Sequence, residues 1–252
     1  MITDWLFYLA AIPAVMCNGM GKGGFSGLGG LSLPLMSLVI SPVQAVAITL
    51  PILMLQDVVS LWAYRTQIDW RQVRTCLPGT MIGIAGAAAV QVHVTAPAVQ
   101  LMVGVIAAGF VLATVKKNAE APPADVSLPK ATLWSGVAGF TSFIANAGGP
   151  PMQVYLMPLK LKPPVYAGTM TMLFAIVNWV KFLAFIALGQ VSTANLSTSA
   201  ALMPVAVAST FLGVWMVKRM SGAKFYPIVR ALTLIVGVKL IWDGLHGLLK
   251  PG

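Results

Sequence analysis

Long apolar stretches alternate with short polar connections along the chain, which is the pattern of membrane-crossing helices. A full crossing by a helix needs about 20 predominantly apolar residues. Stretches near that length occur at 43–63, 75–92, 98–115, 164–188, 200–217 and 226–247. We therefore expect an all-α integral membrane protein.

Shorter apolar stretches lie in pairs, one pair at the start of each half of the chain. The first pair covers 5–20 and 28–41, and the second covers 131–145 and 149–158. Because these stretches are short for ordinary crossings, each pair predicts a helix, a break and a second helix, either re-entrant or fully spanning. Together with the longer stretches they give about 8 to 10 membrane segments.

The same unit occurs on both sides of a polar, proline-rich segment at 116–130. A Pro-Val-x-Ala-x-x-x-Thr spacing, followed by an amide side chain, is found in both halves: Pro42, Val43, Ala45, Thr49 and Gln56, then Pro164, Val165, Ala167, Thr171 and Asn178. A glycine pair also follows each break, at 29–30 and at 148–149. We therefore expect an N-terminal repeat at 1–115 with a broken hairpin at 5–41, a cytoplasmic linker at 116–130, and a C-terminal repeat at 131–252 with a broken hairpin at 131–158.

The distribution of Lys and Arg orients these segments. Of the sixteen, eleven lie in four connections: Arg65, Arg71 and Arg74; Lys116, Lys117 and Lys130; Lys160 and Lys162; Lys218, Arg219 and Lys224. The positive-inside rule places these connections in the cytoplasm, so the two halves have opposite orientations and both termini lie outside. Inverted repeats that each open with a broken helix are typical of secondary transporters, whose site lies near the membrane midplane.

The composition supports a membrane protein. Of the 252 residues, 58% are hydrophobic and only 9% are charged, and the mean hydropathy is +0.86, whereas about a quarter of residues are charged in soluble domains. The net charge of +10 follows from the cytoplasmic connections, so we expect no nucleic-acid partner. Cys17 and Cys76 form no metal or disulfide pattern, and we expect no metal and no cofactor.

The segment from Cys17 to Pro34 is the first candidate site. Its glycines and Lys22 interrupt an apolar region in which a continuous helix would otherwise be expected. A Gly costs about 1 kcal/mol in a helix, and a Lys at the bilayer centre costs roughly 2.5 to 3.5 kcal/mol. Close helix packing would explain the glycines but not the lysine. We therefore expect a substrate anion to bind at Lys22, Gly23, Gly24, Gly29 and Gly30.

Polar side chains in the apolar helices extend this candidate site. Thr49, Gln56 and Ser60 share one helical face. Thr171, Asn178 and approximately Lys181 share a face of the corresponding helix, so these groups either line the site or bond between packed helices. We also expect anion ligands at the second break and in the last stretch, from Asn146, Gly148, Gly149 and Arg230. We expect Asp57, an isolated intramembrane acid, to be a gate or helix-end residue rather than a proton site.

The two breaks and the duplicated unit resemble a known family. The Gly-Leu-Gly-Gly-Leu-Ser-Leu-Pro run, its partner Asn-Ala-Gly-Gly-Pro-Pro and the repeated Pro-Val-x-Ala are similar to the TauE/SafE (TSUP) family, over nearly the whole chain. The resemblance implies export of small sulfur-containing anions, such as sulfite or sulfoacetate, across a bacterial inner membrane. Lys22 and the Ala145-Asn146-Ala147 sequence depart from the family pattern, and a homodimer is left open.

Three other functions remain open at this point. Proton-coupled uptake of sulfonates would need an intramembrane proton carrier, for which Asp57 is the available group. A membrane-embedded lipid-modifying enzyme would need acids, bases or metal ligands, and His93 and His246 both lie near the outer surface of the predicted bundle. A channel would need a continuous lined pore rather than two broken hairpins. We therefore expect a transporter and no enzymatic activity.

Overall fold

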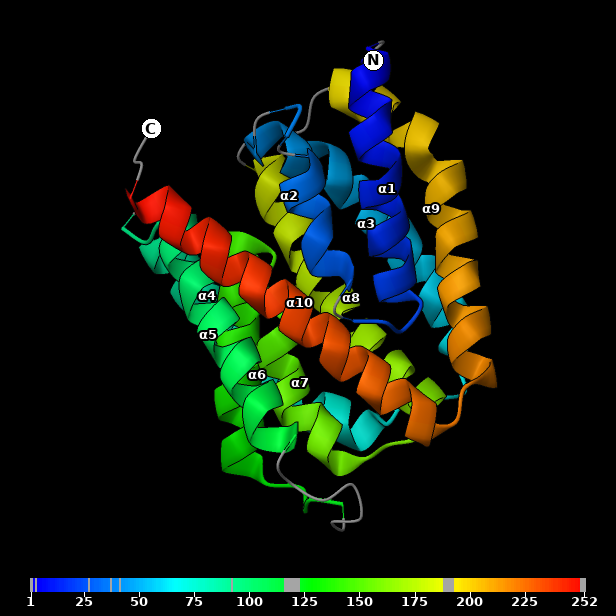
Figure 1. Cartoon of the computed structure of the whole chain (residues 1–252), viewed down its shortest axis with the longest axis vertical. Helices are drawn as coiled ribbons and strands as arrows, with labels where there is room; N and C mark the ends of the chain where they lie inside the picture. Colours follow the sequence, from blue (N-terminus) through cyan, green and yellow to red (C-terminus); the bar gives the residue numbers. More distant parts are fainter. Residues whose placement is uncertain are drawn as a thin grey trace. The chain divides into compact units, whose positions relative to one another are not determined.

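The computed structural model describes residues 2, 4–26, 28–36, 38–40, 42–91, 93–115, 123–187 and 193–249. The regular elements in these ranges are all helical (Figure 1). Residues 116–122 of the predicted linker and residues 188–192 lie outside the described residues. In chain order the elements are α1 (Trp5–Lys22), η1 (Leu28–Leu31), α2 (Ser32–Met36), α3 (Pro42–Tyr64), α4 (Trp70–Val90), α5 (Ala96–Val115), α6 (Leu128–Ala145), α7 (Gly149–Leu156), η2 (Met157–Leu159), α8 (Pro163–Ala187), α9 (Thr193–Arg219) and α10 (Gly222–Leu249).

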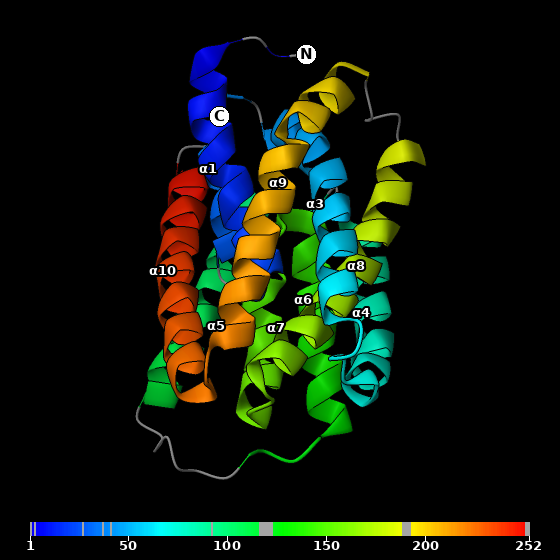
Figure 2. The same ribbon diagram turned by 90° about the vertical axis from the view of Figure 1, so that its right-hand side faces the viewer.

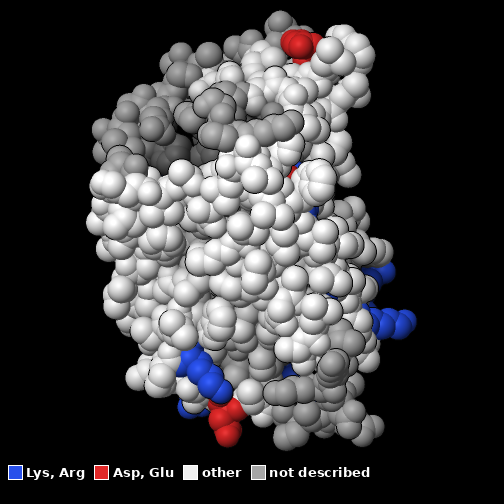
Figure 3. All heavy atoms as spheres, turned by 60° about the vertical axis from the view of Figure 1, so that its left-hand side comes forward, with Lys and Arg blue, Asp and Glu red and all other residues white. Residues whose placement is uncertain are grey.

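Each predicted full span corresponds to one long helix. Among the described residues, six helices are long and apolar enough to cross a membrane, namely α3, α4, α5, α8, α9 and α10. Large apolar side chains on them are exposed, including Ile82 at 68%, Leu112 at 62% and Leu183 at 62%, as contact with lipid requires. Figure 3 shows that charged side chains occupy little of the face in view.

Some helix ends differ from the predicted boundaries. Helix α4 begins at Trp70 rather than near 75, because the Asp69 carboxylate caps its first turn by accepting from the N–H groups of Arg71 and Gln72. This cap extends the helix through the polar turn at 70–74. Helix α9 likewise begins at Thr193 rather than near 200.

Both predicted hairpins contain a helix, a break and a short helix, but the first break is shorter than expected. Gly19 and Gly21 lie inside α1, which continues to Lys22, and the break starts at Gly23. The second helix is also shorter, since α2 ends at Met36 and residues 38–40 form a turn. In the second hairpin, Asn146 ends α6 in the left-handed conformation with φ 53°, and α7 begins at Gly149.

The helices form two compact units, and each unit draws on both halves of the chain. The first consists of Met1–Ile68 with Pro163–Met220, and the second consists of Asp69–Lys162 with Ser221–Gly252. The first unit therefore holds α1, α2, α3, α8 and α9, while the second holds α4 to α7 and α10. The division into inverted repeats at 1–115 and 131–252 stays a prediction.

Helices α1 and α9 lie side by side in the first unit, as both ribbon views show (Figures 1 and 2), and small residues occupy their crossing. A Cβ at Gly23 would lie 2.6 Å from the Gly213 Cα, and a Cβ at Gly19 would overlap the Ser209 side chain. These contacts leave no room for side chains at the crossing. Much of the glycine content of the first break therefore serves close helix packing, which the sequence analysis weighed as the alternative.

The second unit uses the same device at two places. On the α4–α6 pair, a Cβ at Gly83 would overlap the Gly136 carbonyl oxygen, and a Cβ at Gly139 would overlap the Thr80 carbonyl oxygen. On the α5–α10 pair, a Cβ at Gly104 would lie 2.7 Å from the Gly237 carbonyl oxygen. Such close approach of helix backbones is the ordinary means of association where the hydrophobic effect between helices is weak.

Candidate functional site

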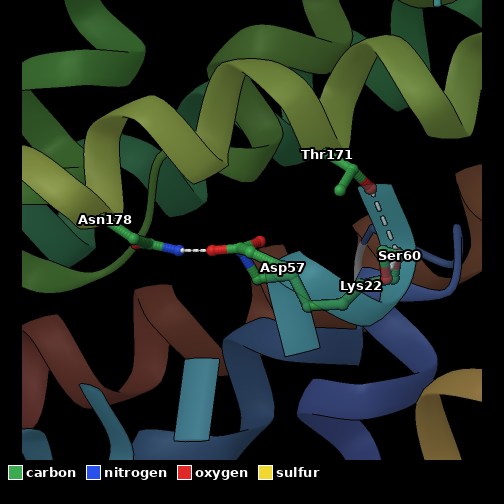
Figure 4. A network of polar contacts seen from close by, with 5 residues as sticks. All are labelled: Lys22, Asp57, Ser60, Thr171 and Asn178. Atoms are coloured by element: carbon green, nitrogen blue, oxygen red, sulfur yellow. Dashed lines mark hydrogen bonds and ion pairs between the residues drawn. The ribbon is translucent and has the colours of Figure 1, made fainter. Parts of the chain in front are cut away.

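The C-terminal end of α1 is the centre of a buried polar cluster in the first unit. The last carbonyls of a helix have no partner within the helix, so they must be satisfied from elsewhere. Ser60 and Thr171 donate from α3 and α8 to the Lys22 carbonyl oxygen, at 3.0 and 3.2 Å. Tyr64 donates to the Gly23 carbonyl oxygen at 2.5 Å. The polar side chains of α3 and α8 therefore hold the end of α1 in place (Figure 4).

The side chain of Lys22 forms an ion pair with Asp57 of α3. The Lys22 Nζ lies 2.5 Å from the Asp57 Oδ1, and Asn178 of α8 donates from its Nδ2 to the other carboxylate oxygen at 2.6 Å (Figure 4). The Asp57 side chain is 1% exposed and that of Lys22 is 13% exposed. The sequence analysis treated these residues separately, and the structure joins them into one charged group.

Lys181 adds a second cation to this group. It lies one helical turn beyond Asn178 on α8, is only 1% exposed, and interacts electrostatically with both Lys22 and Asp57. The first unit contains one other carboxylate, Asp4, which caps α1 at the end opposite to Lys22. With all three groups ionised, the cluster therefore holds two positive charges and one negative charge.

This charge balance favours an anionic ligand. Burying an ion costs several kcal/mol unless a partner of opposite charge compensates it, and the one buried carboxylate cannot neutralise two ammonium groups. Among the described residues, Asp57 alone bonds to the Lys22 Nζ, although an ammonium group has three N–H donors. Lys22 is also the more exposed partner of the ion pair.

The other predicted ligands of the first unit bond to neighbouring groups. The Thr49 hydroxyl donates to the Ala45 carbonyl of its own helix at 2.6 Å and contacts the sulfur of Met36. Gln56 donates from its Nε2 to the Val15 carbonyl oxygen at 3.3 Å, while its buried Oε1 has no hydrogen-bond partner among the described residues. The Thr49 hydroxyl is therefore occupied by contacts between packed helices. Gln56, which precedes Asp57 in the sequence, has an acceptor oxygen without a partner among the described residues.

The glycines of the first break have packing roles. Gly24 has φ +128°, and a Cβ there would lie 2.8 Å from the Val217 side chain, so another residue would be strained at this position. Gly29 packs against Gly21, since a Cβ added at Gly21 would lie 2.8 Å from the Gly29 nitrogen. Gly30 belongs to the short turn η1, and the helix that follows it has only five residues. The helix that follows Gly29–Gly30 is therefore the short α2, and an anion site at its start stays a prediction.

The second break provides fewer backbone donors than the sequence analysis expected. Gly148 and Gly149 start α7, but Pro150 and Pro151 follow and carry no N–H group. The Met152 N–H is already bonded to the Gly148 carbonyl oxygen at 3.3 Å. Two prolines in the first turn thus weaken the expected anion site at this helix end.

Arg230, Asn146, Gly148 and Gly149 belong to the second unit, which has a polar cluster of its own. Thr233 of α10 bonds to the Gln153 side chain of α7, and Tyr155 donates to the Gln72 Oε1 at 2.8 Å. The Nε of Arg230, one turn from Thr233, is buried without a partner among the described residues. Sequence reasoning missed Gln153 and Thr233, although both are polar residues within apolar stretches.

The comparisons with known proteins identify one family. The family model described as Sulfite exporter TauE/SafE matches residues 11–240, which covers the charged cluster and both breaks. No curated protein and no solved structure matches the chain.

Proposed function

We propose a transport function on the premise that the chain belongs to the sulfite exporter TauE/SafE family. As a member it is a multi-pass membrane protein of an anion exporter family, and its six long apolar helices agree with this. The protein is proposed to export small sulfur-containing anions, such as sulfite or an organosulfonate, from the cytoplasm of a bacterium through the inner membrane. The membrane orientation, with both termini outside, belongs to the same proposal.

The buried cluster of Lys22, Asp57 and Lys181 is the observation that carries this proposal. Two ammonium groups and one carboxylate lie together on helices that are otherwise apolar, and the two cations outnumber the one buried carboxylate. A sulfite or sulfonate group supplies several hydrogen-bond acceptors and the missing negative charge. We propose that it binds beside Lys22 and Lys181, near the membrane midplane, with the Asn178 amide close to the site.

The packing of the two units supports an inverted repeat. In the first unit, α1 precedes a break and crosses α9 through small residues; in the second unit, α6 precedes a break and crosses α4 in the same way. In the proposed repeat α6 is the counterpart of α1, and α4 is the counterpart of α9. The two crossings therefore correspond, as alternating access by two related bundles would require.

The membrane potential is sufficient to drive export. An interior-negative potential favours the outward movement of a monoanion by about 2.3 kcal/mol per 100 mV. Export therefore needs no obligatory coupling ion. Proton-coupled uptake is the second candidate, because the fully buried Asp57 carboxylate lies beside two lysines and could carry a proton. A homodimer has no support in the structure or in the comparisons.

A flux assay with purified protein in liposomes tests the proposed function. We expect efflux of sulfite, sulfoacetate or methanesulfonate at a rate well above that of protein-free liposomes, because each presents the oxygens and charge that the lysines require. Glycerol and choline, a neutral and a cationic solute, serve as controls and should not move. The absence of flux for every anion of the panel, from protein that is folded and inserted, would refute the proposal.

A further inference from the structure

We propose that Asp57 sets the charge of the anion that the site accepts. In this inference, which rests on the proposed function, the carboxylate cancels one of the two lysine charges and leaves a single positive charge for the ligand. The preferred substrates would then be monoanions, such as an alkylsulfonate or hydrogensulfite. Dianions of similar size and shape would be rejected.

The geometry assigns this role to Asp57 because both of its carboxylate oxygens are bonded within the cluster and its side chain is buried. One oxygen bonds to Lys22 and the other accepts from Asn178, and the side chain is 1% exposed. An acidic group that touched the substrate would repel it. Held between a cation and an amide donor, Asp57 instead reduces the positive charge that the ligand meets, without occupying the remaining donors of Lys22.

The surroundings make the charge count decisive. Charges a few ångströms apart interact more strongly in a protein interior than in water, and screening by salt is weak there. Residues 1–68 and 163–220 contain no carboxylate near the cluster other than Asp57, since Asp4 lies at the far end of α1. A dianion would add a second negative charge that no cation balances, whereas a monoanion brings the cluster to neutrality.

The neighbouring amide offers a way to separate net charge from position. Asn178 donates directly to Asp57. A double variant with Asp57→Asn and Asn178→Asp therefore moves the carboxylate from α3 to the neighbouring position on α8 and keeps the number of charges. The Asp57→Asn variant has no carboxylate, the Asn178→Asp variant has two, and the double variant has one. Both substitutions preserve side-chain size and shape in all three variants.

The experiment compares two ligands of nearly equal size and fixed charge near neutral pH, methanesulfonate and sulfate. Dissociation constants are measured by calorimetry on the purified chain in detergent. We expect the wild-type protein to prefer methanesulfonate. Asp57→Asn should shift the ratio of the two dissociation constants in favour of sulfate by at least about tenfold, which corresponds to about 1.4 kcal/mol. Asn178→Asp should weaken the binding of both anions, and the double variant should restore the wild-type preference.

Several results would overturn the inference. An unchanged ratio in Asp57→Asn, with binding intact, would show that Asp57 has only a structural role. A double variant that folds and keeps the sulfate preference of Asp57→Asn would show that position rather than net charge decides. If Asp57→Asn fails to fold, Asn178→Asp decides: its added carboxylate should shift the ratio further towards methanesulfonate, and an unchanged ratio would overturn the inference. Failure of the proposed function appears differently, as a wild-type protein that binds neither anion.

Discussion

The Lys181→Met variant is expected to lose anion transport while keeping or increasing its stability. The substitution removes the second buried cation and leaves the Lys22–Asp57 pair intact, so the cluster becomes neutral without an anion. The Lys181 side chain is 1% exposed, so its charge is costly to bury, and the methionine fills a similar volume without that charge. We expect efflux to fall by about two orders of magnitude, because roughly 2.7 kcal/mol of binding free energy would be lost.

Thermal unfolding in detergent, with and without substrate, provides the second measurement for this variant. A ligand at 100 times its dissociation constant stabilises a protein by about 2.7 kcal/mol, and Lys181→Met should lose that stabilisation. Lys239→Met is the matched control, because Lys239 also lies on an apolar helix but is paired with Asp243 one turn away. An unfolded Lys181→Met protein, or one with wild-type flux, would contradict the assignment.

The Lys22→Met variant is expected to lose both transport and stability. Here the substitution breaks an existing buried ion pair and leaves the Asp57 carboxylate without its closest cation. Breaking a buried pair in this way costs about 3 to 5 kcal/mol, and nearby Lys181 should keep the loss towards the lower value.

A double-mutant cycle with Asp57→Leu measures this coupling. If the pair is the cause, Lys22→Met together with Asp57→Leu should recover much of the stability that either single variant loses. Chemical denaturation in mixed micelles gives the free energies of unfolding for the cycle. Additive losses in the double variant would mean that Lys22 and Asp57 stabilise the protein independently.

The long helices could be predicted from the sequence, because each depends on a local property of the chain. An apolar stretch of about 20 residues is sufficient to define a crossing, and all six predicted stretches correspond to helices. The positions of the two breaks were also evident from their glycines. The extent of the first break could not be predicted from local pattern. Gly19 and Gly21 are helical, and α9 packs against Gly19 while η1 packs against Gly21.

The candidate site was predicted in its members but not in its connections. Lys22, Asn178 and Lys181 were all identified as polar groups in apolar surroundings. The Lys22–Asp57 pair joins residues 35 positions apart on two helices, and no spacing rule relates them. The roles of Ser60 and Tyr64 depend on the carbonyl groups at the end of α1, which become visible only when the helix end is known.

The most direct test of the central claim, export of an anion driven by its own gradient, is efflux under a controlled potential. Liposomes containing the protein are loaded with methanesulfonate, and a potassium and valinomycin gradient makes the interior negative. We predict that efflux accelerates as the interior becomes more negative, that collapse of a proton gradient leaves it unchanged, and that Lys181→Met abolishes it. An efflux rate that does not depend on the membrane potential, but falls to zero when the proton gradient is collapsed, would contradict the account and favour proton-coupled transport through Asp57.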